Sequence, residues 1–213
     1  MTTSARGRSS DAAPSGDEST DPPATVLWLT KGLGRGGMEQ LLVNHSRVAD
    51  RDAFDYRAAY LVERPHSVAE ELRSEGVPVT RLGSGRALDP RWVRDLLREI
   101  DAAGVDLIHA HSPLPASVAR VVLRLTRRRV PVVVTEHNRW DRYAAPTRIV
   151  NRVTFGLNDA ALAVSDDCRS TMPPHVRGEV TVVEHGIDAD RVAESLARRD
   201  RIRDELGVAP GTV

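Results

Sequence analysis

Short apolar runs alternate along the chain with segments in which apolar residues recur at three- to four-residue spacing. The runs are typical of buried strands, and the spacing is typical of amphipathic helices. Seven strands are predicted, at 25–29, 56–62, 77–82, 105–110, 130–135, 160–164 and 180–183. Helices are predicted between them, at 38–49, 67–76, 90–103, around 118–125, at 147–157 and at 165–172.

This alternation predicts an α/β fold with a doubly wound, mostly parallel sheet of about seven strands, a Rossmann-like domain. The valine run within 130–135 indicates a strand that is buried on both faces. In such sheets ligands bind beyond the carboxyl ends of the strands, so the residues that follow each strand are the candidates for function.

Several helices carry their own signals. Ser67 and Glu70 form a predicted capping box for a helix that Gly76 ends, and Asp89 is a predicted N-cap in front of Pro90. Two other helices are predicted from apolar positions at helical spacing, which are Met38, Leu41, Leu42, Val48 and Ala49 in one and Val118, Val121, Val122 and Leu125 in the other.

Composition divides the chain into three parts. Residues 1–24 hold two arginines against four acids, a net charge of −2, and almost no large apolar residue, so we expect a disordered tail. Residues 25–189 are expected to form the domain. Residues 190–213 are predicted to be a helical linker, whose last residues resemble a turn that feeds a further strand.

Charge and cysteine content narrow the function classes. The chain has 30 basic and 30 acidic residues, which argues against an electrostatic nucleic-acid binder. One cysteine, Cys168, leaves no partner for an internal disulfide and fits a reducing compartment. Without an apolar span or a signal sequence, we expect a cytoplasmic protein with at most peripheral membrane contact. The arginines at 127–129 complement a helix dipole, and anionic lipid is a second interpretation.

The loop after the first strand is rich in glycine. Gly32, Gly34 and Gly37 match G-x-G-x-x-G, and Glu63 ends the second strand, which together favour an NAD(P)- or flavin-binding protein. The pair Gly36 and Gly37 instead lies at the predicted helix start, where backbone N–H groups can approach an oxygen-rich ligand. A loop without a ligand is the third interpretation.

Histidines follow the fourth strand. His109 and His111 are two residues apart and therefore share one face of the strand. They are interpreted as a metal pair, as two packed and hydrogen-bonded histidines, or as a site where His111 faces substrate. After the fifth strand, charged, amide and aromatic residues crowd the segment 137–143, which suits sugar or phosphate recognition but also a salt-bridged surface loop.

Two later turns complete the set. Ser165 is interpreted as an N-cap whose helix terminus also suits an anion. His185 and Gly186 form a turn after the seventh strand, and His185 faces either the cleft or solvent.

Five short motifs follow one another along the chain, each where a predicted strand ends. They are Gly-Gly-Met-Glu at 36–39, Asp-Leu-Ile-His-Ala-His-Ser at 106–112, Val-Val-Val-Thr-Glu-His-Asn at 132–138, Ala-Val-Ser-Asp at 163–166 and Val-Val-Glu-His-Gly-Ile-Asp at 182–188. Over roughly residues 25–206 they resemble the N-terminal, acceptor-side domain of the GT-B retaining glycosyltransferases of family 4.

The resemblance implies roles for single residues. His111 is the implied catalytic residue, in contact with the transferred sugar. The implied substrate-binding residues are Gly36, Gly37, His137, Asn138, Arg139, Arg142, Tyr143, Ser165, His185 and Gly186. The resemblance implies hexosyl transfer from a nucleotide-diphosphate sugar to a sugar or lipid-linked acceptor, with no metal and no other cofactor.

The same resemblance implies a second domain that carries a Glu-x7-Glu motif and most of the donor site. Nothing like that motif follows Val213, so we expect little turnover from this chain alone and a C-terminal GT-B domain as a partner in trans. Two alternatives stay open at this point. One is the NAD(P)- or flavin-binding protein, and the other is a non-catalytic module that binds an acceptor glycan or lipid through 140–143.

Overall fold

All strands belong to one parallel sheet, in the order β3-β2-β1-β4-β5-β6-β7. The computed structural model describes residues 22–86, 89–187 and 189–209, so the predicted tail, except 22–24, and residues 210–213 lie outside the described residues. The strands are β1 (Ala24–Gly32), β2 (Phe54–Val62), β3 (Val79–Arg81), β4 (Leu107–Ala110), β5 (Val132–Glu136), β6 (Ala160–Ala163) and β7 (Val180–Val182). The predicted α/β class and the doubly wound seven-stranded sheet are confirmed.

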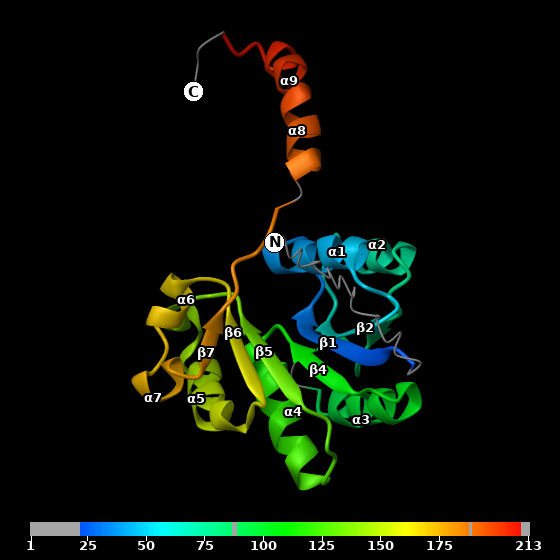
Figure 1. The fold of residues 1–213 in the computed structure, drawn as a ribbon, viewed down its shortest axis with the longest axis vertical. Helices are drawn as coiled ribbons and strands as arrows, with labels where there is room; N and C mark the ends of the chain where they lie inside the picture. Colours follow the sequence, from blue (N-terminus) through cyan, green and yellow to red (C-terminus); the bar gives the residue numbers. More distant parts are fainter. Residues whose placement is uncertain (1–21, 87–88, 188, 210–213) are drawn as a thin grey trace, which may run out of the picture.

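Helices connect the strands and then lead away from the sheet. They are α1 (Gly37–Val48), α2 (Ala69–Ser74), α3 (Arg91–Ala103), α4 (Pro113–Leu125), α5 (Ala145–Thr154), α6 (Asp166–Ser170) and α7 (Pro174–Arg177), with short 3-10 turns η1 (Trp140–Arg142) and η2 (Phe155–Leu157). After β7, the predicted helical linker consists of two helices, α8 (Ala189–Ala197) and α9 (Arg199–Glu205), which extend away from the domain (Figure 1).

The strand order fixes which face each helix covers. From β1 to β3 the chain moves in one direction across the sheet, and from β4 to β7 it moves in the other. Because crossovers between parallel strands are right-handed, this reversal puts α1 and α2 on one face and α3 to α7 on the opposite face. Figure 1 shows the two layers, and each has its own buried apolar cluster.

One half of the sheet is covered on a single face. The side chains of Leu107, His109 and Leu162 point to the α1 face, yet α1 and α2 lie over β1 to β3. All three are only partly buried, and they line a cleft of about 840 Å³. Val133 of β5 is also only partly buried, because its side chain points to this open face. The strand predicted to be buried on both faces is therefore fully covered on one face only.

The predicted capping box is wrong, although the glycine that ends its helix is confirmed. Ser67 Oγ accepts a hydrogen bond from the Ala69 amide, but Glu70 forms an ion pair with Arg73 instead of reaching back. Gly76 ends this segment with a φ of 78°, a left-handed conformation that glycine adopts at little cost.

Helix α4 presents a different side to the core than its apolar spacing indicates. Its buried positions include Ala116, Ala119 and Leu123, because small alanines let the helix approach the sheet closely. Val121 and Leu125, which belong to the stripe that predicts the helix, point outward, and Leu125 is 78% exposed. Val48 of α1 is likewise exposed rather than part of a core stripe.

The orientation of α4 predicts opposite outcomes for one substitution at two positions. Leu123→Ala removes a side chain that is 3% exposed, so the free energy of unfolding should fall by about 2–5 kcal/mol. Leu125→Ala should change it by less than about 0.5 kcal/mol. Urea unfolding of both variants measures this, and equal losses would show that the outward stripe is buried in solution.

Candidate functional site

The register of β4 and β5 brings the candidate histidines together. His109 is paired with Trp28 on one side and Val133 on the other, so His109, His111 and Thr135 share the face that α1 and α2 leave open. His137 follows β5 by one residue, at the carboxyl edge. The two-residue period of the strands therefore places residues 26 positions apart in the sequence next to one another.

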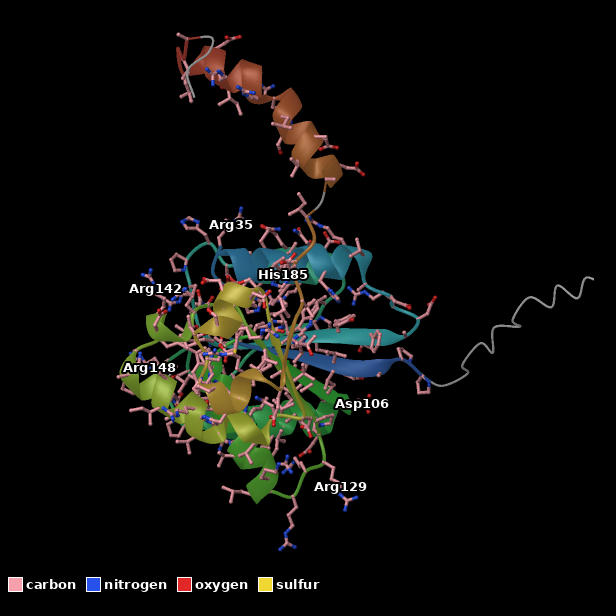
Figure 2. The ribbon with its side chains drawn as sticks, turned by 60° about the vertical axis from the view of Figure 1, so that its left-hand side comes forward. Arg35, Asp106, Arg129, Arg142, Arg148 and His185 are labelled. Carbon is pink, nitrogen blue, oxygen red and sulfur yellow. The ribbon has the colours of Figure 1, made fainter. Side chains whose placement is uncertain are left out.

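Four histidines form a row along the cleft. Ring centroids are 4.1 Å apart for His109 and His111, 5.3 Å for His111 and His137, and 5.5 Å for His137 and the nearly parallel ring of His185. Figure 2 shows His185 on the segment that follows β7, near α1, and both line the same cleft. The row joins β4, β5 and the turn after β7.

One buried nitrogen of this row has no hydrogen-bond partner among the described residues. His109 Nε2 lies 2.7 Å from Thr135 Oγ1, and His111 Nδ1 lies 3.0 Å from His137 Nε2. His111 is 9% exposed, and its Nε2 is buried with no hydrogen-bond partner among the described residues. Leaving such a group unpaired costs about 1–3 kcal/mol, so a ligand hydroxyl at this atom would be favoured.

Burial keeps the three inner histidines of the row, His109, His111 and His137, neutral. Desolvation lowers the pKa of His109 and His137 to about 4 and holds the pKa of His111 well below its usual range. Neighbouring histidines lower these pKa values further, because a second positive charge nearby is unfavourable. Neutral imidazoles can orient hydroxyl groups, and they are poorly suited to act as charged acids at neutral pH.

The glycine-rich loop divides into two parts. A Cβ on Gly32 would lie 3.0 Å from the Val62 carbonyl oxygen and 3.2 Å from Arg64 Cγ, and a Cβ on Gly34 would also contact Arg64. The first two glycines therefore pack against the chain itself, and β1 extends through Gly32, further than predicted. A Cβ on Gly37 meets nothing within 4 Å, whereas a Cβ on Gly36 would lie 2.6 Å from Glu39 Oε2, so this end of the loop is open at Gly37 only.

Gly36 and Gly37 begin α1 as predicted. Gly36 is the N-cap, and because it has no side chain it offers no acceptor to the first-turn N–H groups of this 12-residue helix. The amide of Lys31 donates to Ser112 Oγ at 3.0 Å, which ties the loop to the residue after His111. This contact holds the beginning of the loop at the carboxyl end of β4, while Gly36 and Gly37 are not among the residues that line the cleft.

The segment 137–143 is more internal than its composition indicates. Trp140 is buried, so it offers no ring face for stacking, and Tyr143 donates a hydrogen bond of 2.6 Å to Glu136 Oε2. Arg139 pairs with Asp141 and Asp167. The expectation of free guanidinium and aromatic groups here is corrected for these residues, while Asn138 and Arg142 are exposed, and no described residue forms an ion pair with Arg142.

Two other predicted residues lie at the same edge. Ser165 is the N-cap of α6, where its Oγ accepts from the Cys168 amide at 3.2 Å. His185 and Gly186 are exposed and line the cleft. The Ser165 side chain thus stabilises the first turn of this five-residue helix.

Sequence reasoning missed a buried polar network beneath the cleft. Asn151 Nδ2 donates to Glu136 Oε1 at 2.7 Å, and Arg120 Nη1 donates to Asn151 Oδ1 at 3.0 Å. Burial raises the pKa of the Glu136 carboxyl, while Tyr143 and Asn151 oppose the rise by hydrogen bonding. It also missed that Trp28, His45 and Tyr56 form the aromatic wall of the cleft.

The described residues contain neither a cluster of metal ligands nor a helix suited to cross a membrane. No group of three or more His, Cys, Asp or Glu residues among them is arranged to hold a metal ion. Among the helices of the described ranges, none combines the length and the apolar character that crossing a bilayer requires.

The fold and its carboxyl-edge cleft define a Rossmann-like, GT-B type domain. The model of the family named Glycosyltransferase Family 4 matches residues 35–191. Because that match covers more than half of the chain, the protein belongs to glycosyltransferase family 4. A comparison of the sequence with curated proteins finds no match.

Solved structures show the same fold at low identity. HepE of Anabaena in complex with UDP is 18% identical with a TM-score of 0.65, covering 87% of this chain and 50% of its own. A glycosyltransferase of Rickettsia africae is 14% identical with a TM-score of 0.65, covering 89% and 51%. UDP-GlcNAc 2-epimerase of Neisseria meningitidis, bound to UDP-GlcNAc, is 12% identical with a TM-score of 0.52, covering 74% and 46%. The chain thus spans about half the length of the structures it matches.

The lowered histidine pKa values predict an acid-sensitive domain. Unfolded histidines take up protons near pH 6.5, whereas His109 and His137 resist until about pH 4, so the unfolded state binds more protons between these values. The free energy of unfolding should therefore fall as pH drops from 6.5 to 4. His137→Gln should flatten this slope in urea titrations.

His175→Gln provides the control for that slope. His175 is exposed on α7, outside the histidine row, so the substitution should leave the wild-type slope unchanged. A His137→Gln slope equal to that of the wild type would contradict the burial described here.

Removal of the Tyr143 hydroxyl should lower the stability of the domain. Tyr143→Phe leaves the buried Glu136 short of a donor and should lower the free energy of unfolding by about 1–3 kcal/mol. Tyr60→Phe is the matched control, because Tyr60 donates to the exposed Glu63, which water can solvate. Chemical denaturation should show a smaller loss for Tyr60→Phe, and the reverse order would refute the assignment.

Proposed function

We propose that this domain forms the acceptor-side wall of the cleft in a retaining, nucleotide-sugar dependent glycosyltransferase. The observation that carries the proposal is His111 Nε2, a buried and unpartnered hydrogen-bonding atom at the carboxyl edge of the sheet. Family membership supports a sugar as the ligand. The UDP bound to HepE and the UDP-GlcNAc bound to the Neisseria epimerase support a nucleotide-sugar as the donor.

In this proposal His111 orients the transferred sugar. Its Nδ1 is engaged with His137, which fixes the ring and leaves Nε2 for a sugar hydroxyl. The His185 turn lies over His137 and is exposed, so it is the layer that a ligand meets first. Asn138, Arg142, Ser165 and Gly186 lie around the same edge and are proposed as further substrate contacts.

The open start of α1 is proposed to face the donor diphosphate. Gly37 presents its N–H group with open space around it, the Glu39 carboxylate lies beside Gly36, and the helix dipole favours negative charge at this helix start. During transfer, the acceptor hydroxyl attacks the anomeric carbon on the face that the diphosphate leaves. The new C–O bond forms as the bond to phosphate breaks, and the departing phosphate takes the hydroxyl proton. Fixed dipoles stabilise the charge that develops there.

Turnover is proposed to need a second, donor-binding half. The chain spans about half the length of the structures it matches. We expect the chain alone to release almost no sugar from UDP-glucose or GDP-mannose, as measured by mass spectrometry. Joined to a nucleotide-binding GT-B half, it should transfer hexose.

His111 provides the sharpest test of the proposal. In the joined protein, His111→Ala should lower kcat/KM by about 10- to 100-fold, the value of one hydrogen bond to a sugar hydroxyl. His175→Ala on α7 is the control and should retain wild-type activity. An unchanged kcat/KM for His111→Ala would reject the role of His111.

The competing interpretation, an NAD(P)-binding protein, predicts NADH binding, which the contacts of the glycine-rich loop disfavour. Gly32 and Gly34 pack against Arg64, and Glu63 accepts from Tyr60 and pairs with Arg81, so the dinucleotide fingerprint is occupied by the chain itself. Fluorescence titration should detect no NADH binding at micromolar concentrations. Micromolar NADH binding would overturn the glycosyltransferase proposal in favour of an oxidoreductase.

A further inference from the structure

The outer face of α4 and α5 carries exposed apolar side chains that no described residue covers. Ile149 is 61% exposed and Val153 is 77% exposed on α5, beside Val150. Val121 and Leu125 point outward from α4. The two helices pack side by side in the same layer, as the buried bonds of Arg120 to Asn151 and Thr154 show, so their outward faces form one surface. We call this surface the α4–α5 face.

The charges on this face have a single sign. Neither α4 nor α5 contains an Asp or Glu, and the exposed cations on the two helices and the loop that follows α4 are Arg124, Arg127, Arg129, Arg148 and Arg152. None of these five forms an ion pair with a residue of the described ranges. Figure 2 shows Arg148 beside α5 and Arg129 after α4, both at the outer edge of the molecule.

The basic surface continues at the end of α4. Arg124, Arg128 and Arg129 line a hollow of about 260 Å³ together with Arg120. Arg128 is partly neutralised by Asp101, at 2.7 Å, and Asp159 also lines the hollow. Arg120 Nε and Nη2 are buried without a hydrogen-bond partner. Donors to anionic oxygens are therefore in excess along this edge.

We infer that the α4–α5 face docks on an anionic lipid bilayer. Apolar side chains interleaved with arginines on the same outward side are the pattern of helices that lie in a membrane interface, with aliphatic groups below the headgroups and guanidinium groups at the phosphates. The whole chain has no net charge, so attraction to an anionic surface would come from this local excess. The exposed apolar residues of the cleft, such as Val48 and Ile187, differ in their setting, because Arg47, which lines the cleft with them, pairs with Glu75, and Asp190 adds a negative charge.

This orientation also relates the membrane to the cleft. Both helices start at the carboxyl edge, α4 directly after Ser112 and α5 two residues after Tyr143. A bilayer on the α4–α5 face would therefore lie on the opposite side of the sheet from the cleft, and only the starts of the two helices would be near the edge that carries His111. The inference itself stands without the proposed function, because it concerns a surface and requires no nucleotide.

Vesicle flotation with the full chain tests the inference. Vesicles of an equal mixture of phosphatidylcholine and phosphatidylglycerol should carry the protein, and vesicles of phosphatidylcholine alone should not. Arg148→Gln/Arg152→Gln should weaken binding by about 30-fold, roughly fivefold for each arginine. Leu125→Gln/Val153→Gln should weaken it by at least about tenfold, because less apolar surface is buried.

A matched variant controls for net charge. Arg64→Gln/Arg73→Gln removes two exposed arginines from the α1–α2 side of the sheet and should bind vesicles as the wild type does. Equal losses in both arginine variants, equal binding to both vesicle types, or no binding at all would overturn the inference. So would sedimentation showing a dimer that Leu125→Gln/Val153→Gln abolishes, because the face would then be a contact between copies.

Discussion

Seven strands that all run the same way place seven carboxyl ends on one edge of the sheet, and the rest of the structure depends on this constraint. It brings the glycine-rich loop, the histidines of β4 and β5 and the turn after β7 to one place, although they span residues 31–186. The chain adds strands in one direction from β1 to β3 and in the other from β4 to β7. This reversal decides which helices cover each face of the sheet. Because only α1 and α2 cover one face, the half formed by β4 to β7 stays open there, and the cleft follows.

Burial gives this cleft its chemical character. Imidazoles in a row would repel one another if charged, and removal from water keeps the inner three, His109, His111 and His137, neutral. A neutral, fixed ring with one free nitrogen is suited to holding a hydroxyl group. The buried Glu136 network beneath it ties β5 to α4, α5 and Tyr143, so the edge that carries His137 is anchored from below.

The sequence pattern predicts the strands and the doubly wound parallel sheet well, because alternation of apolar runs and helices reflects backbone periodicity. It places His111, Gly36 and Gly37 correctly at the carboxyl edge. It fails where burial depends on partners distant in sequence. Trp140 and Tyr143 resemble a recognition loop in composition, yet packing against Phe155 and hydrogen bonding to Glu136 turn them inward.

Helix α4 shows the second kind of failure. An apolar stripe predicts a helix correctly but does not say which side meets the sheet, because Ala116 and Ala119 permit closer packing than the valines of the stripe. The stripe residues Val121 and Leu125 then point outward and form part of the α4–α5 face. In the same way, the literal G-x-G-x-x-G match does not reveal that Arg64 lies against its first two glycines.

The central claim is that a donor sugar binds at His111 Nε2. The most direct measurement is nitrogen NMR of the histidine side chains in the ¹⁵N-labelled protein, joined to a nucleotide-binding GT-B half, as UDP-sugar is added. The account predicts that the Nε2 resonance of His111 shifts with donor concentration, while that of His175 on α7 stays constant. Donor binding that leaves the His111 resonance unchanged would contradict the account.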